Sequence, residues 1–219
     1  MVRRGVRPVG RDAAGLAGGG GAAGVRDAAH ATGADAPRWD SVEYWRAYLA
    51  SYSIDVLRAY ENDDWQRISD AQRAAGWLGC AGATEEQLAA TEERLGTRLP
   101  PSYRAFLGAS NGFSHLGPFL YEMRTTRSVG WLREAEPSTW EIIRQGGPEE
   151  AAYMDRVLLI SDVADAQYWL LDPGDVSPGG EWAANIWASW YPGLRERRAS
   201  FAALVADERR SFEQLRDDG

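Results

Sequence analysis

The chain has 219 residues, of which 44% are hydrophobic and ten are tryptophan, enough for one medium-sized domain with a substantial core. The formal net charge of −8 argues against non-specific binding to nucleic acid or to an anionic membrane. The single cysteine, Cys80, excludes an intrachain disulfide and a cysteine-rich zinc site, and no apolar run approaches the roughly 20 residues that span a bilayer.

Residues 1–38 differ in composition from the rest of the chain. They are rich in glycine and alanine and carry six arginines against three aspartates, a net charge of +3, which leaves −11 for the remainder. With few large side chains to bury, this segment is predicted to be a disordered tail. Arg3 and Arg4 are not followed by a compact apolar segment, so a signal peptide is not predicted and a cytoplasmic protein is expected. Residues 39–219 are predicted to form a single domain.

The domain opens with an aromatic pattern of helical period. Apolar residues at three- and four-residue steps predict an amphipathic helix from about Ser41 to Tyr60: Trp39, Val42, Trp45, Leu49, Tyr52 and Val56. A shorter helix is expected from Trp65 to Ala75. The aromatic stripe could form a groove for a partner, but packing in the core is the more common use of such a stripe.

Residues 84–112, TEEQLAATEERLGTRLPPSYRAFLGASNG, read as two short helices joined by a proline corner. Thr84 and Gln87 form a capping box, and Gly96 stands where a left-handed C-cap is required. Proline is tolerated in the first turn of a helix, so the second helix is expected to begin at Pro101 or Ser102. These features explain most of the stretch without a ligand, and they assign it to the fold rather than to a site.

The same stretch strongly resembles the opening motif of the SUKH superfamily, whose Smi/Knr branch includes fungal cell-wall assembly regulators. The resemblance rests on a gap-free set of positions: Glu92, Leu95, Gly96, Leu99, Pro100, Pro101, Tyr103, Phe106, Leu107, Asn111 and Gly112. Later segments such as Leu171-Asp172-Pro173 and Gly180-Glu181-Trp182 extend it to about residues 77–215. The resemblance implies a protein-binding domain of the kind found in bacterial immunity proteins, which neutralise polymorphic toxins. The alternative that it implies is an intracellular regulatory or scaffold protein.

The second half of the chain changes to short strands. Strands are predicted at 119–123, 128–132, 156–161, 167–171 and 181–188, with a turn at Asp172-Pro173-Gly174. Residues 133–155 read as an acidic, irregular insert with one helical turn around Trp140. A last helix is expected from Ser200 to Leu215. The predicted fold is α+β, with an antiparallel sheet of about four to six strands packed by N- and C-terminal helices.

The sequence contains no recognisable catalytic set. It has no phosphate-binding loop and no serine-nucleophile or metalloprotease motif, and His115 is the only histidine of the predicted domain. We therefore expect a non-enzymatic protein without metal or cofactor. A hydrolase that uses a pair of carboxylates is the less favoured alternative.

Acidic and aromatic residues between Glu134 and Trp190 are the predicted contact residues, because loops commonly carry binding function. The candidates are Glu134, Glu136, Glu149, Glu150, Asp162, Asp165, Glu181 and Trp190. For Glu181 a structural role, bonded to backbone or arginine, is the stronger expectation. Acidic loops favour a basic protein partner, such as a nuclease toxin, without direct contact to nucleic acid or membrane.

Overall fold

A computed structural model describes residues 37–61, 68–162, 167–190 and 197–217. The predicted tail lies almost entirely outside these ranges and stays a prediction. Helix α1 runs from Val42–Ala59 with Ser41 as its cap, which confirms the first predicted helix. Helix α2, Asp70–Ala75, begins later than expected, at a capping box formed by Ser69 and Gln72; residues 62–67 lie outside the described part.

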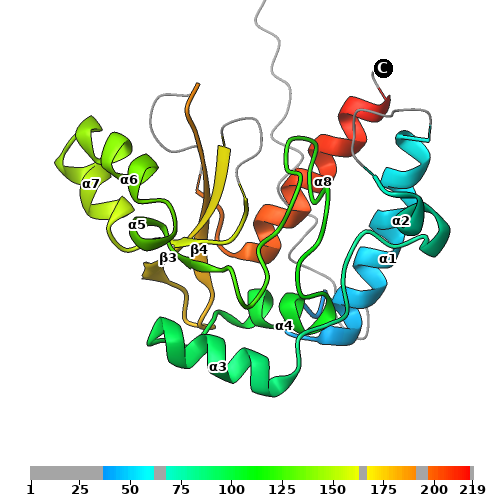
Figure 1. Ribbon diagram of the computed structural model, residues 1–219, viewed down its shortest axis with the longest axis horizontal. Helices are drawn as coiled ribbons and strands as arrows, with labels where there is room; N and C mark the ends of the chain where they lie inside the picture. The colour runs from blue at the N-terminus through cyan, green and yellow to red at the C-terminus, as the bar shows by residue number, and fades with distance from the viewer. Residues whose placement is uncertain (1–36, 62–67, 163–166, 191–196, 218–219) are drawn as a thin grey trace, which may run out of the picture. The chain divides into compact units, whose positions relative to one another are not determined.

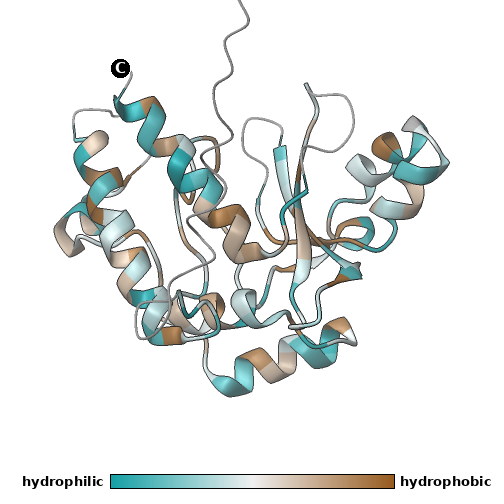
Figure 2. Ribbon diagram, turned by 180° about the vertical axis from the view of Figure 1, so that it is seen from behind, coloured by the Kyte–Doolittle hydropathy of each residue, from teal (hydrophilic) through white to brown (hydrophobic). Residues whose placement is uncertain are grey.

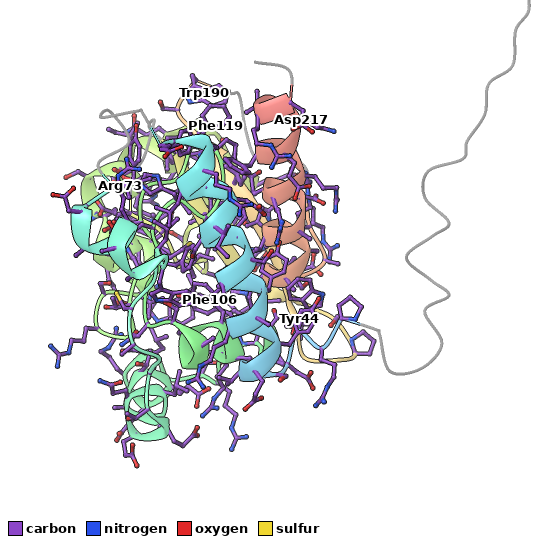
Figure 3. All side chains as sticks on the ribbon, turned by 90° about the vertical axis from the view of Figure 1, so that its right-hand side faces the viewer. Tyr44, Arg73, Phe106, Phe119, Trp190 and Asp217 are labelled. Atoms are coloured by element: carbon purple, nitrogen blue, oxygen red, sulfur yellow. The ribbon has the colours of Figure 1, made fainter. Side chains whose placement is uncertain are left out.

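The aromatic stripe of α1 belongs to the core. Trp45 is completely buried, and its ring lies 5.5 Å from that of Phe106 in helix α4, Pro101–Ala109, and 5.5 Å from that of Phe201 in helix α8, Phe201–Asp217. Phe106 and Phe201 are 5.0 Å apart, and Figure 3 shows Phe106 in the interior behind α1. Rings at these separations add about 0.5–1.5 kcal/mol per pair to their burial. The prediction that the stripe packs in the core is therefore confirmed. The alternative, an open aromatic groove for a partner, is not confirmed.

Helix α3, Glu85–Leu95, and α4 follow the predicted pattern. Thr84 and Gln87 form the capping box, and Gly96 adopts the left-handed conformation, with φ 69°. Glu92 accepts the backbone N–H of Leu99 at 3.0 Å and the Nε of Arg104 at 3.1 Å. This carboxylate therefore fixes the corner between α3 and α4.

Four strands form one antiparallel sheet in chain order. They are β1 Gly130–Trp131, β2 Leu158–Leu159, β3 Gln167–Val176 and β4 Trp182–Ala188. One strand prediction and one turn prediction were wrong. Segment 119–123 makes only isolated bridges, because its backbone bonds are divided between Phe113–His115 and Ser161. The stretch Asp172-Pro173-Gly174 lies inside β3, where the pairing register shifts, and the chain turns at 177–180 instead.

Both faces of the sheet are covered by helices. Trp169 and Leu171 of β3 point into the larger core with α1, α4 and α8, whereas Tyr168 and Leu170 point into a second core. The second core is closed by α5 Leu132–Ala135, α6 Pro137–Ile143, the 3-10 turn η2 Arg144–Gly146 and α7 Pro148–Met154. Figure 1 shows these helices on one side of β3 and β4, and α8 and α1 on the other. The expectation of an irregular insert with one helical turn was therefore wrong.

Candidate functional site

The helices α5–α7 form an acidic layer on the outer face of the sheet. Residues 132–155 contain two arginines, Arg133 and Arg144, against six acids, a net charge of −4: Glu134, Glu136, Glu141, Glu149, Glu150 and Asp155. Glu134, Glu141 and Glu149 are exposed. Figure 2 shows the layer at the right, with hydrophilic and neutral colours over much of its ribbon. We call residues 132–155 the acidic layer.

Its inner side is apolar and well anchored. Leu132, Ile143 and Met154 pack with Leu159 and Leu170 of the sheet in the second core. Such burial stabilises a fold by about 25 cal/mol per Å² of apolar surface removed from water.

Two side-chain hydrogen bonds hold the middle of the layer. Trp140 donates its indole N–H to Asp155 over 2.9 Å, and the hydroxyls of Thr139 and Tyr168 lie 3.3 Å apart. Arg144 stacks over the Trp140 ring, with its guanidinium carbon 4.5 Å from the ring centroid. The short α6 is therefore tied to the end of α7 and to β3, which gives it support that its own length could not supply.

The end of the layer is fixed to the sheet by a polar cluster. Asn185 of β4 donates its amide N–H to the Tyr153 hydroxyl at 2.8 Å, and burial raises the pKa of Tyr153, so the phenol stays protonated. Arg156 lies over the Tyr153 ring and donates to both oxygens of the buried Asp172, at 2.7 and 2.8 Å. A two-pronged guanidinium–carboxylate contact fixes orientation as well as distance. The acidic surface therefore rests on a rigid support.

Two predicted contact residues meet at Arg124. Glu136 accepts its Nη2 at 2.9 Å, and an oxygen of Asp162 lies 3.0 Å from its Nε. The Arg124 side chain is 9% exposed, and its guanidinium also donates to the backbone oxygens of Ser161 and Ser128, at 3.0 and 3.1 Å. Arg124 thus joins the entry to β1, the exit of β2 and the start of α6. Glu136 and Asp162 are therefore engaged by an arginine of the same chain.

Glu122, adjacent to this centre, offers a test by titration. Its carboxylate accepts the Ser114 hydroxyl at 2.9 Å, and partial burial, reinforced by the charge of Asp162, raises the pKa of Glu122. The folded protein therefore holds this proton more tightly than the unfolded chain, so Glu122 disfavours folding progressively as pH rises from its unfolded pKa through the raised value. In Glu122→Gln the stability relative to wild type should rise over that pH interval and then level off, as measured by urea unfolding. A pH-independent difference would contradict this assignment.

The other predicted residues lie in different surroundings. Glu134 is near Arg133, at 3.5 Å, while Glu149 and Glu150 occupy the first turn of α7 and form no ion pair with another described residue. Trp190 is 59% exposed beyond the end of β4, and Figure 3 shows it at the end of the domain away from Tyr44.

Glu181, by contrast, has a structural contact. It accepts both the backbone N–H and the hydroxyl of Ser102, which confirms its expected bond to backbone. Asp165 lies outside the described residues. Of the candidates, Glu134 and Glu149 are exposed on the acidic layer, and Glu150, beside Glu149 in the first turn of α7, is half-buried.

Sequence reasoning missed Ile142, which is 69% exposed in this layer, and the exposed Glu141 beside it. Ile143 is buried in the second core. One helical turn that places Trp140 and Ile143 inward turns Ile142 outward. The spacing of Trp140, Ile142 and Ile143 is visible in the sequence, but it indicates an outward-facing Ile142 only if the segment is a helix.

Other kinds of site are less well supported. Over the described ranges, no group of three or more histidine, cysteine, aspartate or glutamate side chains gathers in a way that could hold a metal ion. None of the helices in the same ranges is long and apolar enough to cross a membrane.

Comparison with known proteins assigns the family. Residues 82–207 match the model of the SMI1 / KNR4 family (SUKH-1), a span that starts just before α3 and ends within α8. No curated protein was found to match the chain. The matched span covers more than half of the chain and contains the whole sheet together with the α3–α4 motif. The chain therefore belongs to the SMI1/KNR4 family (SUKH-1).

Proposed function

We propose that this protein is an immunity protein, which neutralises a toxin domain by binding it directly. The observation that carries the proposal is the acidic layer, which has a net charge of −4 and an exposed isoleucine on a rigid support. Membership of the SUKH-1 family supports the same class of function. In this proposal the partner is a basic domain, such as a nuclease, and the protein acts in the cytoplasm, without cofactor or catalysis.

The chemistry of the layer fits such a partner. Glu149 and Glu150 lie together in the first turn of α7, and neither is neutralised by an arginine of the described chain. Charges of this kind raise the rate of encounter with a cationic protein, whereas a central apolar side chain such as Ile142 slows dissociation. An apolar anchor within an acidic surface therefore provides both fast capture and retention.

The experiment uses purified toxin domains encoded beside this gene, with binding kinetics and protection of toxin-expressing cells as readouts. We expect the double variant Glu149→Gln, Glu150→Gln to slow association about three- to tenfold at low salt, with a smaller difference at high salt. Ile142→Ala should instead speed dissociation about fivefold or more, because it removes an apolar anchor.

The double variant Glu86→Gln, Glu93→Gln is the matched control, since it also removes two exposed acids from one helix, α3. If it slows association as much as the α7 variant, binding depends only on overall charge and the acidic layer is not the contact surface. Absence of binding and of protection for every neighbouring toxin would overturn the immunity function itself.

A further inference from the structure

Helix α2 is attached to the domain mainly at its two ends. None of its six residues is buried, and none of its side chains belongs to either core. Ile68 before the helix and Trp77 after it are half-buried and pack against the larger core. The helix has its own capping box at Ser69 and its own left-handed C-cap at Gly76, with φ 62°. Residues 68–77 therefore form a strap that is anchored at both ends and closed by local caps.

Two side-chain hydrogen bonds join the middle of the strap to the rest of the domain. Arg73 donates to the backbone oxygen of Tyr60, just after α1, at 3.1 Å. Gln72 donates its amide N–H to the Ser114 hydroxyl at 3.1 Å, and this hydroxyl donates in turn to the Glu122 carboxylate at 2.9 Å. A hydroxyl that accepts one hydrogen bond and donates another to a charged acceptor forms a cooperative chain. We call Gln72, Ser114 and Glu122 the latch.

The strap has little to hold it besides these contacts. Within the described ranges, no further hydrogen bond or ion pair connects α2 to another element. Segments that bury few apolar side chains open locally at a lower free energy than the core does. A helix of six residues is not stable alone in water, so α2 should unfold when its contacts break. Loss of the latch and opening of the strap are therefore a single event.

A hollow of about 520 Å³ lies between α1 and the strap, and Figure 1 shows α2 next to α1. Its lining comes from Ile54, Leu57, Arg58 and Glu61 of α1 and from Arg73 of the strap. Ile54 is 44% exposed, whereas Leu57 is half-buried and packs against the larger core. Both walls precede residues 82–207, so the hollow lies outside the span that matches the SUKH-1 family.

We propose that this strap opens between Ile68 and Trp77 while the rest of the domain stays folded, and that the latch controls the opening. In the open state Arg73 leaves the hollow and Leu57 becomes accessible to solvent. The strap thus gates the apolar wall of α1, and its closed position depends on a carboxylate, Glu122, from a loop that follows α4. The inference goes beyond the proposed function, which uses the acidic layer, and neither depends on the other.

Hydrogen exchange of the full chain, followed by NMR, tests the proposal. In wild type the amides of Arg73, Gly76 and Trp77, which bond within the strap, should exchange about a hundredfold faster than those of α4, or more. Ser114→Ala and Arg73→Ala should each speed exchange in the strap about fivefold, the loss of one hydrogen bond, and leave α4 unchanged. Arg73→Lys keeps a donor and should have a smaller effect. Ser211→Ala, which removes a half-buried hydroxyl from α8, is the control and should change neither region.

A second measurement follows access to Leu57. Leu57→Cys is made in a Cys80→Ser background, because the native thiol is exposed, and its reaction with a thiol reagent is timed. Ser114→Ala should speed this reaction about fivefold as well, whereas Ile54→Cys, at an exposed position, should react at an unchanged rate. Strap amides that exchange as slowly as those of α4, equal acceleration of both regions by the latch variants, or a reaction at Leu57→Cys that ignores Ser114→Ala would overturn the proposal.

Discussion

Arg124→Ala is expected to lower the free energy of unfolding by about 3 kcal/mol. The Arg124 side chain is 9% exposed, and its guanidinium contacts the backbone oxygens of Ser161 and Ser128 together with the carboxylates of Glu136 and Asp162. The two carboxylates, 35% and 59% exposed, can turn to water when the arginine is lost. Ser161 is completely buried whereas Ser128 is exposed, so the larger part of the effect comes from the Ser161 backbone oxygen left without a donor.

Urea unfolding of three variants separates these contributions. Glu136→Gln removes one partly exposed ion pair and should cost under about 1 kcal/mol. Arg124→Lys keeps the charge but cannot reach several acceptors at once, so its stability should fall between wild type and Arg124→Ala. Arg127→Ala, at an exposed arginine of the same loop, is the control. An Arg124→Ala variant as stable as Arg127→Ala would show that the four contacts contribute nothing net.

Local features of the fold could be predicted from the sequence. The ends of α3 depend on Thr84, Gln87 and Gly96, residues within one turn of the boundary that each determines. The stripe of α1 is a regular period over many turns, which a sequence displays directly. Strands β2, β3 and β4 pair with their neighbours in the sequence across short connections, whereas β1 pairs with β2 across the whole acidic layer.

The acidic layer could not be predicted in the same way. Helices α6 and α7 have seven residues each, too few to establish a period, and each begins at a proline that can also be read as a loop signal. Their stability comes from a core shared with β2 and β3, that is, from tertiary packing and not from the helices' own sequences. The turn predicted at Asp172-Pro173-Gly174 does not form for a similar reason, a tertiary contact. Arg156 binds Asp172 and holds the segment in the strand.

The candidate contact residues show a similar limit. Composition correctly indicated an acidic region, but it could not separate Glu149 and Glu150, which face no arginine, from Glu136 and Asp162, which are bound to Arg124. That separation requires knowing which residue lies opposite each carboxylate. In the sequence Arg124 follows a mainly apolar stretch, 119–123, and precedes a polar one, 125–128, and nothing local marks it as a shared partner.

Glu181→Ala should cost about 2–4 kcal/mol of unfolding free energy. Helix α4 receives no cap from its own N-terminal residues, since Pro100 occupies the cap position and Pro101 lacks an N–H. The first free donor is the N–H of Ser102, which is completely buried and has no access to water. Glu181, 79 positions later, accepts this N–H at 2.8 Å and the Ser102 hydroxyl at 2.6 Å. Its carboxylate therefore caps α4 and carries a negative charge at the positive end of the helix.

The N–H and the hydroxyl of Ser102 share the carboxylate of Glu181. The losses of unfolding free energy caused by substitutions at Glu181 and at Ser102 should therefore not add. Ser102→Ala retains the N–H bond and should cost about 1–2 kcal/mol, and Glu181→Gln, which keeps one acceptor oxygen, should fall in the same range. Combining Glu181→Ala with Ser102→Ala should cost less than the sum of the single variants by about 1 kcal/mol, since the hydroxyl is no longer left unpaired. Strict additivity would show that Glu181 supports the β3–β4 turn alone. A coupling of the expected sign would explain why the Pro-Pro-Ser-Tyr and Gly-Glu-Trp segments occur together in this chain: one supplies the helix and the other its cap.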